Sequence, residues 1–111
     1  NNMASVFKNA GIQCGLVDDA TADVYTAPSN ARAVLHAVNV SNTAALSAEK
    51  VTIKVSVDGG TTFRSVLTNG EVPPSDTLQL DKPINLEPND KIRIYGTSNT
   101  LECFLSILEL T

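Results

Sequence analysis

Alternation of apolar and polar residues with a period of two is the feature that most restricts the fold of this chain. In residues 51–58, Val51, Ile53, Val55 and Val57 fall on one face of an extended segment, and polar residues fall on the other. Because successive side chains of a strand point to opposite faces of a sheet, this period predicts a half-buried β-strand with one solvated side.

Turn signals separate this segment from others of the same kind. Residues 58–61 contain two glycines and predict a hairpin turn, from which residues 63–67 return as a strand. The Asn-Gly pair at 69–70 predicts a second turn. The two prolines at 73–74 predict a sheet edge or a corner, because proline has no N–H to donate to a strand ladder. Further strands are expected over residues 5–7, 12–17, 23–26, 34–40, 78–80, 84–86, 91–95 and 101–110.

Composition supports this pattern. Val, Ile and Thr account for 28 of the 111 residues, and these β-branched side chains suit a pleated sheet. The sequence therefore predicts an all-β fold, an antiparallel β-sandwich (jelly-roll or Ig-like) of about eight short strands. We expect residues 1–20 to form an N-terminal arm or edge strands, with breakers at 9–11 and 18–19, and residues 21–111 to form the sandwich.

Charge and hydropathy exclude several classes of function. The net charge is -4, and the eight Lys and Arg residues are scattered, so we expect no nucleic-acid partner. No apolar run approaches the roughly 20 residues of a membrane helix, and residues 1–5 do not look like a signal peptide. Met3 leaves open whether the natural chain starts at this residue. With five aromatic residues in the chain, carbohydrate binding by stacking is disfavoured.

The residues that could carry chemistry do not form a recognisable site. His36 is the single histidine and lies among Val34, Val38 and Val40 in an expected inner strand, so we interpret it as a structural residue with a partner in the sheet. No nucleophile motif accompanies it. The Asp cluster at 18–23 lacks the spacing of a calcium loop. Its members are Asp18, Asp19 and Asp23, and a solvated turn is the favoured interpretation. We expect no enzyme activity, no metal and no cofactor.

The two cysteines, Cys14 and Cys103, are too few to indicate a disulfide framework. Two buried free thiols are the favoured interpretation, since unpaired cysteine behaves as a small hydrophobic residue. A bridge between them is the alternative, and it would close a long loop.

The last strand is apolar on both faces. Leu101, Cys103, Leu105 and Ile107 share the face expected to meet the core, while Phe104, Leu108 and Leu110 lie on the opposite face. An apolar face of this kind marks either a protein–protein contact or a surface covered by another layer of the same chain. Together with Phe7, these three residues are our candidates for a contact surface, and a dimer or trimer would bury them.

Several segments resemble a group of small β-rich bacteriophage virion proteins. Residues 24–28 (VYTAP) resemble the entry motif of that group, and residues 33–42 resemble the strand that follows. Residues 86–94 resemble its characteristic turn and strand, and residues 106–109 resemble its C-terminal ending. The chain departs from the group in having Asn30 and Asn89 where the group has turn glycines. Asparagine tolerates the left-handed backbone better than most residues.

The resemblance implies a structural part of a phage particle, either a capsid decoration (cement) protein or a neck or tail component. It implies location in the virion, and partners among the major capsid protein or other virion proteins and further copies of the chain. A receptor-binding or glycan-binding module of a tail or fibre is the second hypothesis. The resemblance implies no catalytic residues.

Overall fold

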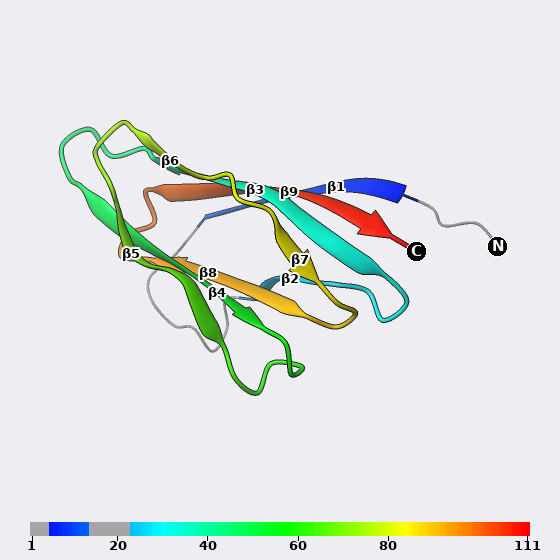
Figure 1. Cartoon of the computed structure of the whole chain (residues 1–111). Helices are drawn as coiled ribbons and strands as arrows, with labels where there is room; N and C mark the ends of the chain where they lie inside the picture. The colour runs from blue at the N-terminus through cyan, green and yellow to red at the C-terminus, as the bar shows by residue number, and fades with distance from the viewer. Residues whose placement is uncertain (1–4, 14–22) are drawn as a thin grey trace.

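The structure is a computed structural model that describes residues 5–13 and 23–111. These residues form strands joined by turns and loops (Figure 1). The strands are β1 (Ser5–Gln13), β2 (Asp23–Thr26), β3 (Arg32–Asn42), β4 (Glu49–Ser56), β5 (Arg64–Val72), β6 (Thr77–Leu80), β7 (Ile84–Leu86), β8 (Lys91–Gly96) and β9 (Leu101–Leu110). Among the described residues no helix has the length and apolar character needed to cross a membrane.

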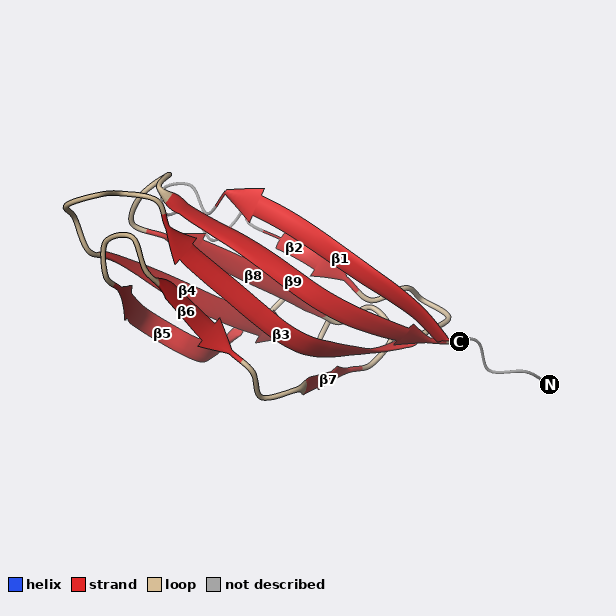
Figure 2. Cartoon of the chain, turned by 90° about the horizontal axis from the view of Figure 1, so that it is seen from above, coloured by secondary structure: helices blue, strands red, loops and turns tan. Residues whose placement is uncertain are grey.

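The strands form two antiparallel sheets packed face to face (Figure 2). The first sheet has the order β1-β9-β3-β6, with β7 also paired to β3, and the second has the order β2-β8-β4-β5. The chain thus pairs from its ends inward: β1 with β9, β2 with β8, β3 with β6 and β7, and β4 with β5. Such a folded ribbon, shared between two sheets, is a jelly roll. The predicted all-β sandwich is confirmed, and its topology is the jelly-roll alternative.

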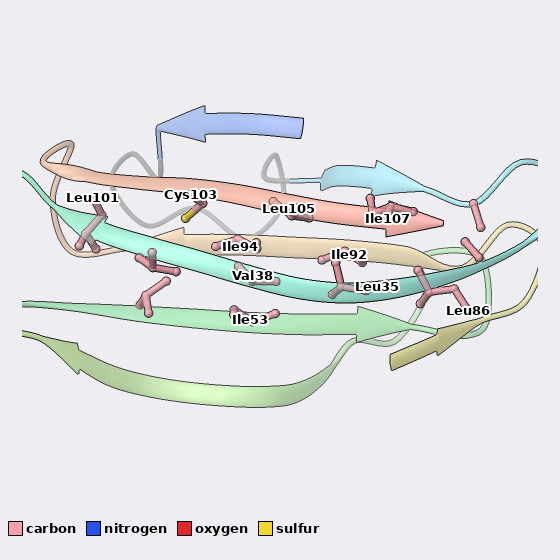
Figure 3. Packing of buried hydrophobic residues seen from close by; sticks show 14 of the residues in the cluster. Leu35, Val38, Ile53, Leu86, Ile92, Ile94, Leu101, Cys103, Leu105 and Ile107 are labelled. Atoms are coloured by element: carbon pink, nitrogen blue, oxygen red, sulfur yellow. The ribbon is translucent and has the colours of Figure 1, made fainter. Parts of the chain in front are cut away.

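The hydrophobic core lies between the inner faces of the two sheets (Figure 3). Leu35 and Leu105 enter it from the first sheet, and Ile53, Ile92 and Ile94 enter it from the second, each at most 1% exposed. Fully burying one such side chain contributes about 1.5–3 kcal/mol. The predicted inward face of the last strand, with Leu101, Cys103, Leu105 and Ile107, is confirmed.

The expectation of a free thiol at Cys103 is wrong. Cys103 is disulfide-bonded and lies in the core. Cys14, the other cysteine of the sequence, lies outside the described residues. The count of cysteines alone favoured thiols, because it carries no information on the distance between two residues far apart in the chain.

β1 corrects the expected N-terminal strands. Residues 5–7 and 9–11 belong to one continuous strand that pairs residue by residue with β9, so the expected break at 9–11 is wrong. Gly11 lies opposite Phe104, and a Cβ on this glycine would lie 3.7 Å from Cδ2 of that ring. The glycine is thus part of a strand rather than a turn. The expected boundary near residue 20 lies outside the described residues.

β3 is an inner strand, as predicted, but it contains a bulge. Its register with β9 shifts between Leu35 and Ala37, and His36 is the additional residue. Leu35 and Val38 are both buried, whereas His36 is exposed. The expectation that His36 shares a face with Val38 is therefore wrong, because a bulge changes the face of the residues that follow it.

A second bulge replaces the turn expected at residues 69–70. Asn69 and Gly70 lie inside β5, where the register with β4 shifts between Val51 and Ile53. Asn69 has a φ of 50° and donates its N–H to Oγ1 of Thr52 at 3.1 Å. The Asn-Gly pair does mark a residue with positive φ, Asn69, but the chain continues as a strand through it. The hairpin turn at 58–61 and the returning strand are confirmed.

The segments that resemble phage virion proteins meet at one end of the sandwich. Ala27 donates its N–H to the Asp90 carbonyl at 2.8 Å and accepts from the Asn89 N–H at 3.0 Å. Asn89 has a φ of 71°, the left-handed conformation for which the resemblance has glycine. Asn30 is not among the described residues with positive φ, so that turn does not need a glycine.

Candidate functional site

The four candidate contact residues lie on one surface. Phe7 and Leu108 are directly opposite each other in the β1–β9 ladder, and Phe104 and Leu110 lie on the same outer face of β9. We call the set Phe7, Phe104, Leu108 and Leu110 the outer patch. Phe7 is 80% exposed and Phe104 is 48% exposed, while Leu108 and Leu110 are half-buried. Because two sequence-distant strands supply these residues, pairing of the chain termini creates the surface.

The outer face of the second sheet has a different character. Arg93 pairs with the Asp23 carboxylate, and its guanidinium lies 3.8 Å from the centre of the Phe63 ring. Lys54 lies over the ring of Tyr95, with 5.5 Å from Nζ to the ring centre. Cations stacked on aromatic rings cover these apolar groups while keeping the charges in contact with water. The sandwich therefore has one outer face of paired charges and one with exposed phenylalanines.

The aromatic side chains differ in exposure and in their position in the fold. Phe63 and Tyr95 are covered by cations, and Tyr25 packs against the core. Phe7 and Phe104 are exposed, and both lie on strands. A glycan-binding loop cluster would have exposed rings beside Asp and Asn in loops, and this arrangement is not found among the described residues.

A polar cluster that the sequence interpretation missed joins the two sheets. Glu109 is buried, with 7% of its surface exposed, on the inner face of β9. Its Oε2 accepts a hydrogen bond from the Tyr25 hydroxyl, and its Oε1 lies 3.9 Å from Nζ of Lys8. Partial burial, with the bond to Glu109 and the charge of that carboxylate, raises the pKa of Tyr25 well above its usual range. The alternation along β9 could have predicted the burial of Glu109, because residues two apart in a strand share a face and Glu109 follows Leu105 and Ile107 in this series.

The residues considered for catalysis or metal binding do not converge. Asp23 is engaged by Arg93, and Asp18 and Asp19 lie outside the described residues. His36 is exposed at its bulge. Within residues 5–13 and 23–111 no group of three or more metal-binding side chains is found. The outer patch is therefore the candidate functional site.

Comparison with known proteins relates the fold to viral capsids. One chain of the capsid structure of Helicobacter pylori bacteriophage KHP30 matches 99% of this chain over 92% of its own length, with 13% identity and a TM-score of 0.53. A chain in the structure of infectious bursal disease virus, Gx strain, matches 98% of this chain with 10% identity and a TM-score of 0.56. A chain in the crystal structure of the VP2 subviral particle of infectious bursal disease virus matches 98% of this chain with 11% identity and a TM-score of 0.51. No protein-family model and no curated protein matches the sequence.

This chain spans nearly the whole of the phage capsid chain and 32% of each of the two bursal disease virus chains. At these identities the likeness concerns the fold. The chain has a β-sandwich of the kind found in viral capsid proteins, and this agrees with the fold that the resemblance to virion proteins implied.

Proposed function

We propose that this protein is a non-enzymatic structural component of a bacteriophage particle, a capsid decoration (cement) protein that stabilises the shell through protein–protein contacts. The observation that carries the proposal is the fold shared with a chain of a phage capsid structure, which covers 92% of that chain at a TM-score of 0.53. The sequence resemblance to phage virion proteins, which covers residues 24–110, independently supports a structural role in the virion.

The outer patch is the proposed contact surface. Two phenylalanines that are 80% and 48% exposed each leave apolar area in water, and covering one such side chain fully is worth about 1.5–3 kcal/mol. Repetition by capsid symmetry would add many such contacts, so that each can be weak while the assembly is strong. The major capsid protein, another virion protein and a second or third copy of this chain are the proposed partners.

The alternative is a neck, tail or fibre component that binds a receptor or glycan. The exposed rings of Phe7 and Phe104 are the feature that would serve it. Specific signals on a glycan array, with no binding to purified capsids, would favour this alternative over the decoration role.

Copy number in purified particles tests the proposal. Shell proteins repeat on the order of hundreds of times, whereas neck and tail rings hold about three, six or twelve copies. We expect the protein to copurify with intact particles at the higher number. Absence from particles would contradict a virion role, and the lower number would move the protein to the neck or tail.

A matched pair of variants tests the surface. Phe7→Ser with Phe104→Ser removes the exposed rings of the outer patch. Val57→Ser with Val66→Ser removes side chains of similar exposure, 75% and 41%, from the residue after β4 and from β5. We expect the first variant to bind particles at least about tenfold more weakly and the second to bind like the wild type. Equal binding by both would contradict the assignment of the contact to the outer patch.

A further inference from the structure

The four edges of the two sheets differ in how they are protected. The β2 edge is four residues long and contains a register shift, and the β5 edge contains two shifts. The edge beside β3 is divided between β6 and β7, with Pro83 between them. Short strands, bulges and prolines are the devices by which proteins prevent an edge from pairing with another chain.

β1 is nine residues long and is neither shortened, bulged nor interrupted by proline. It contains no proline, and it pairs with β9 without a register shift from Ser5 to Gln13. Lys8 is its single charged residue, and that side chain lies near Glu109. A charged residue can also protect an edge, but the Lys8 ammonium lies 3.9 Å from the Glu109 carboxylate of its own chain, which offsets its charge. A long, regular edge of this kind is a template for one more antiparallel strand.

The sequence of β1 is complementary to itself. Antiparallel pairing centred on Asn9 is the register in which all nine residues find a partner, and it keeps the inner and outer faces of the two sheets continuous. In this register Phe7 lies opposite Gly11 of the partner subunit, Lys8 lies opposite Ala10 of the partner subunit, and the two Asn9 residues face each other. Centring on Lys8 instead would place two like charges in direct opposition, which is destabilising.

This pairing also covers the exposed rings. Phe104 already lies beside Gly11 from the β9 side, 3.7 Å from the position of a Cβ on that residue. Phe7 of the partner subunit would lie on the other side of the same glycine, and the two rings would then flank it. Aromatic side chains over a strand glycine and aromatic pairs across strands both stabilise sheets. The most exposed ring of the outer patch, Phe7 at 80%, thereby gains an apolar neighbour.

We propose that β1 pairs antiparallel with β1 of a second copy of this chain, about a two-fold axis at Asn9, and joins the two first sheets into one continuous sheet. The inference rests on the self-association included in the proposed function and specifies its partner, register and symmetry. The resulting dimer presents both copies of the remaining outer patch on a single surface.

Cysteine crosslinking tests the register. Residues directly opposite in an antiparallel pair have Cα atoms about 4.5–5.5 Å apart, within the range that a disulfide spans. Asn9→Cys should therefore give a covalent dimer on mild oxidation. Ser5→Cys is the matched control on the same exposed face of β1, and in the proposed register its two copies lie about 27 Å apart, which a disulfide cannot bridge. A Ser5→Cys dimer without an Asn9→Cys dimer would overturn the register.

Charge at the axis tests the interface. Asn9→Lys places two lysines face to face, while Ser5→Lys places its lysine opposite Gln13 of the partner subunit. By analytical ultracentrifugation we expect a dimer for the wild type and for Ser5→Lys, and a dissociation constant at least about tenfold higher for Asn9→Lys. Equal melting temperatures at a dilution where both proteins are monomeric would show that Asn9→Lys acts on the interface and not on folding. A wild-type monomer or trimer at high concentration overturns the inference.

Failure of this inference is distinguishable from failure of the proposed function. Copurification with particles measures the virion role whatever the state of the free protein. A particle-bound protein that is monomeric in solution would refute β1 pairing and leave the virion role standing. A dimer that never associates with particles would refute the virion role and leave β1 pairing standing.

Discussion

The hydroxyl of Tyr25 on β2 donates a hydrogen bond to Oε2 of Glu109 on β9, and this bond joins the two sheets of the sandwich. Tyr25 belongs to the first segment that resembles phage virion proteins, and Glu109 belongs to the last. The carboxylate is buried and also lies near Lys8. Removing the hydroxyl leaves a buried charge with one partner fewer.

Tyr25→Phe should destabilise the fold by about 1–3 kcal/mol, since a buried carboxylate loses a hydrogen bond. Tyr95→Phe is the control, because Tyr95 lies on the outer face of the second sheet beside Lys54. Denaturant unfolding at neutral pH measures both. Equal stability of the two variants would contradict a role for the Tyr25–Glu109 bond.

The same pair predicts a response to alkaline pH. The pKa of Tyr25 is raised in the folded protein, whereas in the unfolded chain it lies near 10. As pH rises above about 10 the unfolded state releases the proton first, so the stability that this group contributes declines. Tyr25→Phe should therefore lose less stability between about pH 9 and 11 than the wild type, as measured by urea unfolding across that range.

The β4–β5 turn predicts a response to acid. Asp58 accepts hydrogen bonds from the Thr62 N–H and the Ser56 hydroxyl, both at 2.8 Å, and these lower the pKa of Asp58. Its contribution is present above about pH 4, the pKa of an unfolded aspartate, and is lost as pH falls through the lowered folded value.

Asp58→Ala should accordingly lower the melting temperature at neutral pH and have a smaller effect near about pH 2. Asp81→Ala, at an exposed aspartate between β6 and β7, is the control. A pH-independent effect of Asp58→Ala would count against the charge-assisted turn.

Substitution of Gly60 is predicted to destabilise the fold. Its φ is 100°, and a Cβ there would lie 3.2 Å from Cδ of Lys91. Gly60→Ala should cost about 1–3 kcal/mol, because side-chain-bearing residues are strained in this conformation. Gly11→Ala should be tolerated, since a Cβ at that position would meet its neighbours at ordinary van der Waals distance. Thermal unfolding of the two variants compares them, and an equal loss in both would contradict the conformational explanation.

Two adjacent residues of β9, Phe104 and Leu105, are expected to affect different properties of the protein, particle binding and folding stability. Leu105 is fully buried, and Leu105→Ala should cost about 2–5 kcal/mol through the cavity it leaves. Phe104 points outward at 48% exposure, so Phe104→Ala should change stability little and weaken association with particles. Unfolding and particle-binding assays on both variants measure these two effects. A large loss of stability in Phe104→Ala, together with weaker particle binding but unchanged stability in Leu105→Ala, would refute the assigned faces.

Much of the fold was predictable because its signals are local. Alternation in residues 51–57 is sufficient to predict β4 and its buried face, and the glycines at 58–61 predict the turn that follows. The parity of β9 similarly separates Leu105 from Phe104. The outer position of Phe104, Leu108 and Leu110 follows from the same period.

The features that the sequence analysis missed depend on register. His36 and Asn69 leave the regular alternation because the strands beside them pair with a one-residue offset. The Cys103 disulfide and the Tyr25–Glu109 bond each involve residues whose proximity is decided by how the chain rolls up.

The sequence by itself determined that this protein is a sheet with one surplus apolar face, since side-chain period and β-branched content are properties of neighbouring residues. Tertiary structure decided which residues share that face. Phe7 and Leu108 are separated by almost the whole chain, and they become neighbours because the jelly roll pairs its first strand with its last. Long-range strand order is set by the joint packing of all the strands around one core, and no local pattern contains it.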